Sequence, residues 1–85
     1  MRNLETTTAL DVGEAISRIK GYFGPGGLGL TLTEEEENCL AFSGGGGYVR
    51  AAVDDCEGRT TINLVTQEWE YQIDSFALSL PRAKN

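Results

Sequence analysis

The chain has no histidine and few cysteines, and these two shortages exclude most familiar catalytic frameworks. Its 85 residues include no His and two Cys. Without histidine, one chain cannot form the Ser–His or Cys–His pairs that activate a nucleophile. Two cysteines make neither a disulfide framework nor a zinc site, and the expected strands hold Cys39 and Cys56 too far apart for a bridge. The sequence therefore does not favour an enzyme, and it predicts no metal and no cofactor.

Basic residues and long apolar runs are also scarce. Seven Lys and Arg stand against thirteen Asp and Glu, which gives a net charge of −6. The basic residues are scattered, so a phosphate backbone would be repelled and nucleic-acid binding is not expected. No apolar run approaches the roughly 20 residues that a membrane span needs, and residues 1–5 lack the apolar core of a secretory signal. We therefore expect a cytoplasmic protein that binds neither membranes nor nucleic acid.

Glycine and glutamate are present in runs, and these runs separate segments of alternating polarity. The sequence contains a tetraglutamate at 34–37 and a tetraglycine at 44–47. Apolar and polar residues alternate on both sides of these runs, which is typical of strands with one buried face. The pattern predicts strands over 28–33, 39–43, 48–54 and 59–66. The runs 34–37, 44–47 and 55–58 are then the turns of an antiparallel sheet.

Two segments have the apolar periodicity of helices. In the first, Thr8 or Asp11 is the expected N-cap, and Asp11 with Glu14 has the spacing of a capping box. Glycine and proline at 24–27 end this helix. In the second, Thr66 is the expected cap, Pro81 ends the helix, and a basic tail follows at 82–85. The apolar positions are Val12, Ile16, Ile19 and Phe23 in the first helix, and Trp69, Ile73, Phe76 and Leu80 in the second.

The element order predicts an α+β fold in one domain, 1–85. We expect a two-layer sandwich of the order (β)-α-β-β-β-β-α, with a four-stranded antiparallel meander and both helices on one face. Residues 2–8 are either a short edge strand or a frayed terminus. The core is then formed by the helix residues above and by one face of the strands: Leu28, Leu30, Leu32, Leu40, Phe42, Val49, Ala51, Val53, Ile62 and Leu64.

A meander places alternate turns at opposite ends of the sheet, so we expect an acidic end and a glycine-rich end. The acidic end collects Glu34 to Glu37, Asp54, Asp55 and Glu57. We interpret it as a solvated turn region rather than a cation site, because runs of like charge are usually exposed. Near the glycine-rich end the sequence places aromatic side chains that could bind a small molecule: Tyr22, Tyr48, Trp69 and Tyr71.

Two functions of different classes remain open. The first is a non-catalytic protein-interaction module, with a homo-oligomer or another protein as partner, because the face away from the helices (Tyr48, Arg50, Ala52, Asn63) could meet a second sheet or chain. The alternative is a small-ligand-binding domain. The Thr-rich start, the run of strands and the C-terminal helix resemble a shortened helix-grip fold, that of polyketide-cyclase and lipid-transfer proteins. This resemblance implies a pocket between helix and sheet.

Overall fold

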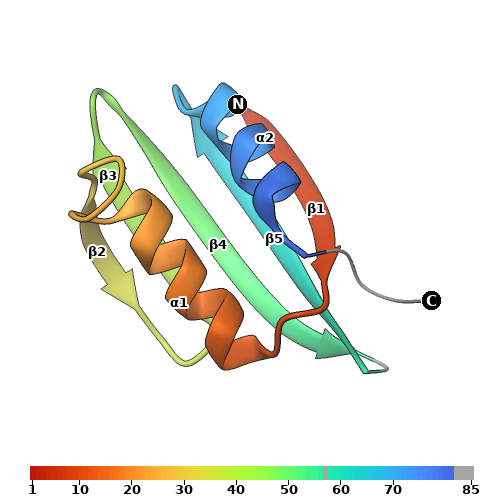
Figure 1. The fold of residues 1–85 in the computed structure, drawn as a ribbon. Coiled ribbons are helices and arrows are strands. Elements are labelled where there is room, and N and C mark those ends of the chain that lie inside the picture. The colour runs from red at the N-terminus through yellow and green to blue at the C-terminus, as the bar shows by residue number, and fades with distance from the viewer. Residues whose placement is uncertain (57, 82–85) are drawn as a thin grey trace.

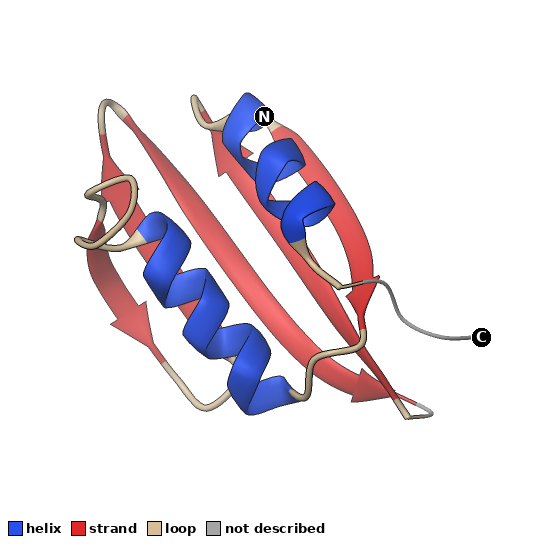
Figure 2. Cartoon of the chain, viewed as in Figure 1, coloured by secondary structure: helices blue, strands red, loops and turns tan. Residues whose placement is uncertain are grey.

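The computed structural model describes residues 1–56 and 58–81, which form five strands and two helices (Figure 1). In chain order the elements are β1 (Arg2–Thr8), α1 (Val12–Phe23), β2 (Thr31–Glu35), β3 (Cys39–Gly44), β4 (Gly47–Cys56), β5 (Arg59–Gln67) and α2 (Glu70–Ser79). The predicted α+β class and the single layer of helices over one sheet are confirmed (Figure 2). The predicted basic tail at 82–85 and the acid Glu57 lie outside the described residues.

The sheet is antiparallel throughout and has the order β1-β5-β4-β3-β2. The predicted meander of β2 to β5 is therefore correct, but it is extended by a fifth strand. Residues 2–8 are an edge strand that pairs with β5 over its whole length, from Arg2 opposite Thr66 to Thr8 opposite Thr60. The chain then crosses the sheet as α1 and reaches the other edge at β2 (Figure 1).

The core lies between the helices and one face of the sheet. Most of the expected core positions are buried, but Leu28, Leu32, Val12, Ile16 and Trp69 are only partly buried. Ala15, which we did not expect in the core, is a fully buried residue of α1. The buried apolar cluster is Ala15, Ile19, Phe23, Leu30, Leu40, Phe42, Val49, Ala51, Val53, Ile62, Leu64, Ile73, Phe76 and Leu80.

The two helices differ in how their N-termini are capped. For α1 the capping box is present: the backbone N–H of Glu14 donates to Asp11, and the Asp11 N–H donates to the Glu14 carboxylate. For α2 the prediction of Thr66 as the cap is wrong. Thr66 stays inside β5 and its buried hydroxyl donates to the Tyr48 carbonyl, while Trp69 occupies the N-cap position without a side-chain cap bond.

The first predicted strand and its turn are shifted along the chain. The strand begins at Thr31 rather than at residue 28, and it continues through Glu34 and Glu35, which we predicted as part of the turn. A bulge between Leu32 and Glu34 allows this shift, and the Thr33 hydroxyl donates to the Ala41 carbonyl beside it. Consecutive residues of a strand point to opposite faces, and the bulge decides which face each acid takes: Glu34 lies opposite Ala41 and pairs with Arg50, while Glu35 pairs with Lys20 of α1.

The tetraglycine forms a tight turn against the start of α2. Gly45 and Gly46 have φ values of +59° and +85°, the left-handed conformations that a two-residue hairpin turn requires. The Trp69 ring lies directly over this turn, and its Nε1–H donates to the Gly44 carbonyl at 3.0 Å. A Cβ atom on Gly45 would lie only 2.6 Å from the Trp69 ring, whereas one on Gly46 would meet nothing within 4 Å. The β3–β4 hairpin and α2 are therefore joined through Trp69.

We predict that Gly45→Ala destabilises the protein more than Gly46→Ala. Both substitutions place an L residue in the left-handed region, which costs about 1 kcal/mol. Gly45→Ala also forces the Trp69 ring to move, and such overpacking adds about 1 kcal/mol or more. Urea unfolding of both variants, followed by Trp69 fluorescence, measures the difference. Equal losses in the two variants would show that the ring contact is unimportant.

Candidate protein-interaction surface

One face of the sheet is left uncovered by α1 and α2. Side chains alternate along each strand, so Val49, Ala51 and Val53 of β4 are buried under the helices while Arg50 and Asp54 are exposed. The strand register carries this alternation across the sheet: Arg50 lies opposite Ala41 on one side and Val65 on the other, and Ala52 lies opposite Cys39 and Asn63. We call this the uncovered face; its central residues are Cys39, Ala41, Ser43, Tyr48, Arg50, Ala52, Asn63 and Val65.

The uncovered face is hollowed at its centre. Small side chains at Ala41, Ala52 and Val65 are flanked by longer ones, and Ala41 is only 9% exposed although no helix covers it. The resulting cavity of about 220 Å³ is lined mainly by apolar atoms. A neighbouring cavity of about 260 Å³ shares Ala41 and Arg50 and extends to Tyr48. Together they form a shallow depression along β3 and β4.

Arg50 stands between the two cavities of the uncovered face. Its guanidinium lies 3.8 Å from the Glu34 carboxylate, and 62% of its side chain is exposed. An exposed ion pair at this distance contributes less than about 1 kcal/mol. The bulge in β2 brings Glu34 to Arg50. Arg50 can therefore turn toward an incoming carboxylate at little cost.

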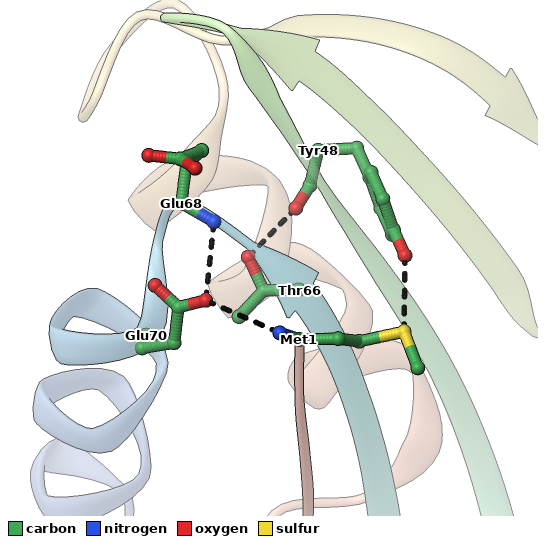
Figure 3. A network of polar contacts seen from close by, with 5 residues as sticks. All are labelled: Met1, Tyr48, Thr66, Glu68 and Glu70. Carbon is green, nitrogen blue, oxygen red and sulfur yellow. Dashed lines mark hydrogen bonds and ion pairs between the residues drawn. The ribbon is translucent and has the colours of Figure 1, made fainter.

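Figure 3 shows the polar contacts that hold Tyr48 at the glycine-rich end. The Thr66 hydroxyl donates to the Tyr48 carbonyl at 2.7 Å, and the Tyr48 hydroxyl donates to the Met1 sulfur at 3.4 Å across β5. The Glu70 carboxylate accepts from the Glu68 N–H at 3.2 Å and lies 3.9 Å from the Met1 amine. Glu68 has a φ of +80°, a strained conformation where β5 turns into α2. Met1, at the N-terminal end of β1, is thereby tied to both β4 and α2.

A larger cavity lies on the other side of the sheet, between α1 and α2. It has a volume of about 510 Å³ and combines aromatic side chains with charged and hydroxyl groups: Leu10, Glu14, Ser17, Arg18, Gly21, Tyr22, Phe76 and Ser79. The Tyr22 ring packs against the Phe76 ring, with centroids 5.2 Å apart. An open cavity of this size with a few polar groups is of the kind that can hold a small molecule.

The four aromatic residues that we predicted as a ligand site lie in different places. Tyr22 lines the cavity between the helices, while Tyr48 lines a cavity on the uncovered face. Trp69 packs over the glycine turn, and Tyr71 is 76% exposed on α2. These residues therefore do not bound one pocket. A ligand-binding role remains a prediction for each of them separately.

The predicted polarity of the sheet is confirmed. β2 and β4 both terminate at the end of the sheet opposite to the Gly45–Gly46 turn, which places Glu36, Glu37, Asp54 and Asp55 together at that end (Figure 1). Within the described ranges, no three His, Cys, Asp or Glu side chains come close enough together to hold a metal ion. Cys39 lies opposite Ala52 and is exposed on the uncovered face.

The chain matches no protein-family model, and no curated protein is similar enough in sequence to match it. In the described part of the chain, neither helix is long and apolar enough to cross a membrane. The site must therefore be interpreted from its own geometry.

Two features of this region were not predicted from the sequence. The alternation places Tyr48 and Arg50 on the face away from the helices, but the depression there depends on which long side chains flank Ala41. The second feature is the cavity between the helices. Glu14, Arg18 and Gly21 share one side of α1 at helical spacing, and this polar stripe beside the apolar face was the available signal.

We predict that Thr66→Val destabilises the protein by about 1 kcal/mol. The substitution keeps the shape of the side chain but leaves the Tyr48 carbonyl without the Thr66 donor. Thr61→Val is the matched control, because Thr61 is on the opposite face of β5 and is only partly buried; we expect a change within about 0.5 kcal/mol. Urea unfolding measures both. If the two variants unfold at the same urea concentration, the bond does not stabilise the fold.

Proposed function

We propose that this protein is a non-catalytic protein-interaction module that forms a homodimer and whose uncovered face meets a protein partner. The observation that carries the proposal is the shallow depression along β3 and β4, where a tyrosine and an arginine flank small apolar side chains. Tyrosine and arginine are the residue types that most often anchor protein interfaces, and they do so when they are surrounded by contacts that exclude water.

The chemistry of the depression favours a protein partner of a particular kind. Its floor of Ala41, Ala52 and Val65 is apolar and made of small side chains, which suits a strand or a sheet surface as the partner. Arg50 is weakly held by Glu34 and can instead bind a carboxylate of the partner. We therefore expect a partner that presents small apolar side chains and at least one acidic residue.

We predict that Tyr48→Ala and Arg50→Ala each weaken partner binding by about tenfold, the effect expected for an interface anchor. The chain offers matched controls on the helix layer: Tyr71→Ala and Arg18→Ala remove the same residue types from exposed positions on the other side of the molecule. These controls should bind the partner as the unchanged protein does.

The measurement uses a purified partner. Cross-linking and mass spectrometry identify the protein bound in the source cells, and calorimetric titration of the two purified proteins then gives the affinity of each variant. Loss of binding in the helix-layer variants, with normal binding in the variants at Tyr48 and Arg50, would contradict the proposal.

A second candidate function, binding of a small molecule, is favoured by the cavity between α1 and α2. Its aromatic wall of Tyr22 and Phe76 can pack against an apolar ring, and Arg18 on the same rim can pair with an anionic group. The cavity is thus suited to a small aromatic acid. This is the function that the resemblance to helix-grip proteins implies, although the cavity is lined by α1, α2 and Leu10 rather than by the sheet.

We predict that an anionic aromatic probe, 8-anilinonaphthalene-1-sulfonate, binds this cavity at one saturable site. Arg18→Ala removes a charged hydrogen-bond donor and should weaken binding by about tenfold or more. Arg50→Ala removes the same residue type from the opposite face and should leave binding unchanged. Titration followed by probe fluorescence measures both, and equal binding by both variants would exclude the cavity as the site.

A further inference from the structure

The two edges of the sheet differ in how well they are protected against pairing with another strand. Edge strands present free backbone N–H and C=O groups, and proteins usually blunt them with short length, bulges or charges. β2 has all three devices: it has five residues, it contains a bulge, and it carries Glu34 and Glu35. β2 is therefore a poor template for a further strand.

β1, at the other edge, is neither short nor interrupted by a bulge. It is seven residues long and pairs with β5 in an unbroken register. It contains no proline and no lysine, and three consecutive threonines at 6–8 favour extended backbone. Its outer side faces no other strand among residues 1–56 and 58–81 (Figure 1). Arg2 is already paired with Asp74 of α2 at 2.8 Å, so Glu5 is the charge on β1 without an ion pair in the described part of the chain.

We infer that β1 pairs antiparallel with β1 of a second copy of this chain, which joins two sheets into one. This inference rests on the proposed function, because it specifies the surface through which the interaction module forms its homodimer. A two-fold axis that makes two copies of one edge strand antiparallel stands perpendicular to the sheet. Both helix layers then lie on the same side, and the two uncovered faces form one continuous surface.

The charges on β1 select the register of this pairing. Opposed residues of an antiparallel pair share a face, so Arg2, Leu4, Thr6 and Thr8, on the helix side, must oppose residues of the same set. A register centred on Glu5 would oppose Glu5 to the partner's Glu5, and like charges directly opposed are unfavourable. A register centred on Leu4 avoids this contact. It opposes Leu4 to the partner's Leu4 and Asn3 to the partner's Glu5.

Apolar groups beside β1 also favour the register centred on Leu4. Leu4 is only partly buried, although it packs against the core, and pairing with the partner's Leu4 removes more of it from water. Above β1, Asp74 of α2 reaches Arg2, and Leu78 lies one helical turn further on the same side of α2. Leu78 is 84% exposed. It lies on the side of α2 that a second copy would approach.

Charge substitutions at Asn3 test the pairing. In the register centred on Leu4, Asn3→Glu creates two symmetry-related Glu–Glu contacts and should weaken dimerisation by about five- to tenfold. Asn3→Lys creates two Lys–Glu contacts and should strengthen it by a similar factor. The double variant Asn3→Glu with Glu5→Lys places opposite charges in the same two contacts, so it should dimerise as strongly as Asn3→Lys does. Analytical ultracentrifugation over a concentration series measures each dissociation constant.

The control variants are Thr31→Glu and Thr31→Lys, which make the same charge changes at an exposed position of β2. They should leave dimerisation unchanged, and thermal unfolding confirms that all variants are folded. The inference is overturned if the unchanged protein stays monomeric at every concentration, if the Asn3 variants do not differ from the Thr31 variants, or if the double variant fails to restore the dimer. Arg50→Ala separates the two proposals. If this variant loses partner binding but dimerisation does not respond to the Asn3 substitutions, only the β1 pairing is refuted. If dimerisation responds to the Asn3 substitutions but partner affinity does not depend on Arg50, only the proposed function of the uncovered face is refuted.

Discussion

Because the apolar side chains of the central strands project to one side of the sheet, α1 and α2 must both lie over that side. The helices have twelve and ten residues and are joined to the sheet by short connections, so each covers only part of the face. The cavity between them follows from this division, and the other face of the sheet is left without a covering layer. Both candidate sites are therefore consequences of burying one face under two short helices.

Hydrogen bonds between the layers fix α2 at both of its ends. At its start, the Trp69 indole donates to the Gly44 carbonyl in the β3–β4 turn. Beyond its end, the Thr8 hydroxyl and the Ala9 N–H both donate to the Pro81 carbonyl, while the Leu10 N–H donates to Thr8. The buried Thr8 thus ties β1 to the chain that leaves α2. These contacts, together with the Arg2–Asp74 ion pair, explain how a polar edge strand is held in a fixed position.

Features with a local signal could be predicted from the sequence, and features that depend on distant partners could not. The capping box of α1 and the alternation in β3 to β5 are complete within a few residues. β1 was left open because Asn3, Glu5 and three threonines give no apolar pattern, and its partner β5 lies more than fifty residues away. The Thr66 prediction failed because a hydroxyl near a helix start can equally bond to a neighbouring strand. The alternation in β4 placed Tyr48 and Val49 on different faces of the sheet. Only the nearness of Tyr48 to the glycine turn suggested that it shares a pocket with Tyr22.

The edge and the uncovered face would act together in a dimer. A depression as shallow as that of Ala41 and Ala52 offers few contacts, and one such surface binds a partner weakly. Two copies joined through β1 present two depressions in a fixed relation on one continuous sheet. A partner that is itself repeated or symmetric then makes its second contact at a high effective concentration, which raises the overall affinity without any new residue. Dimerisation through the unprotected edge of β1 can therefore compensate for the weak binding that a single uncovered face provides.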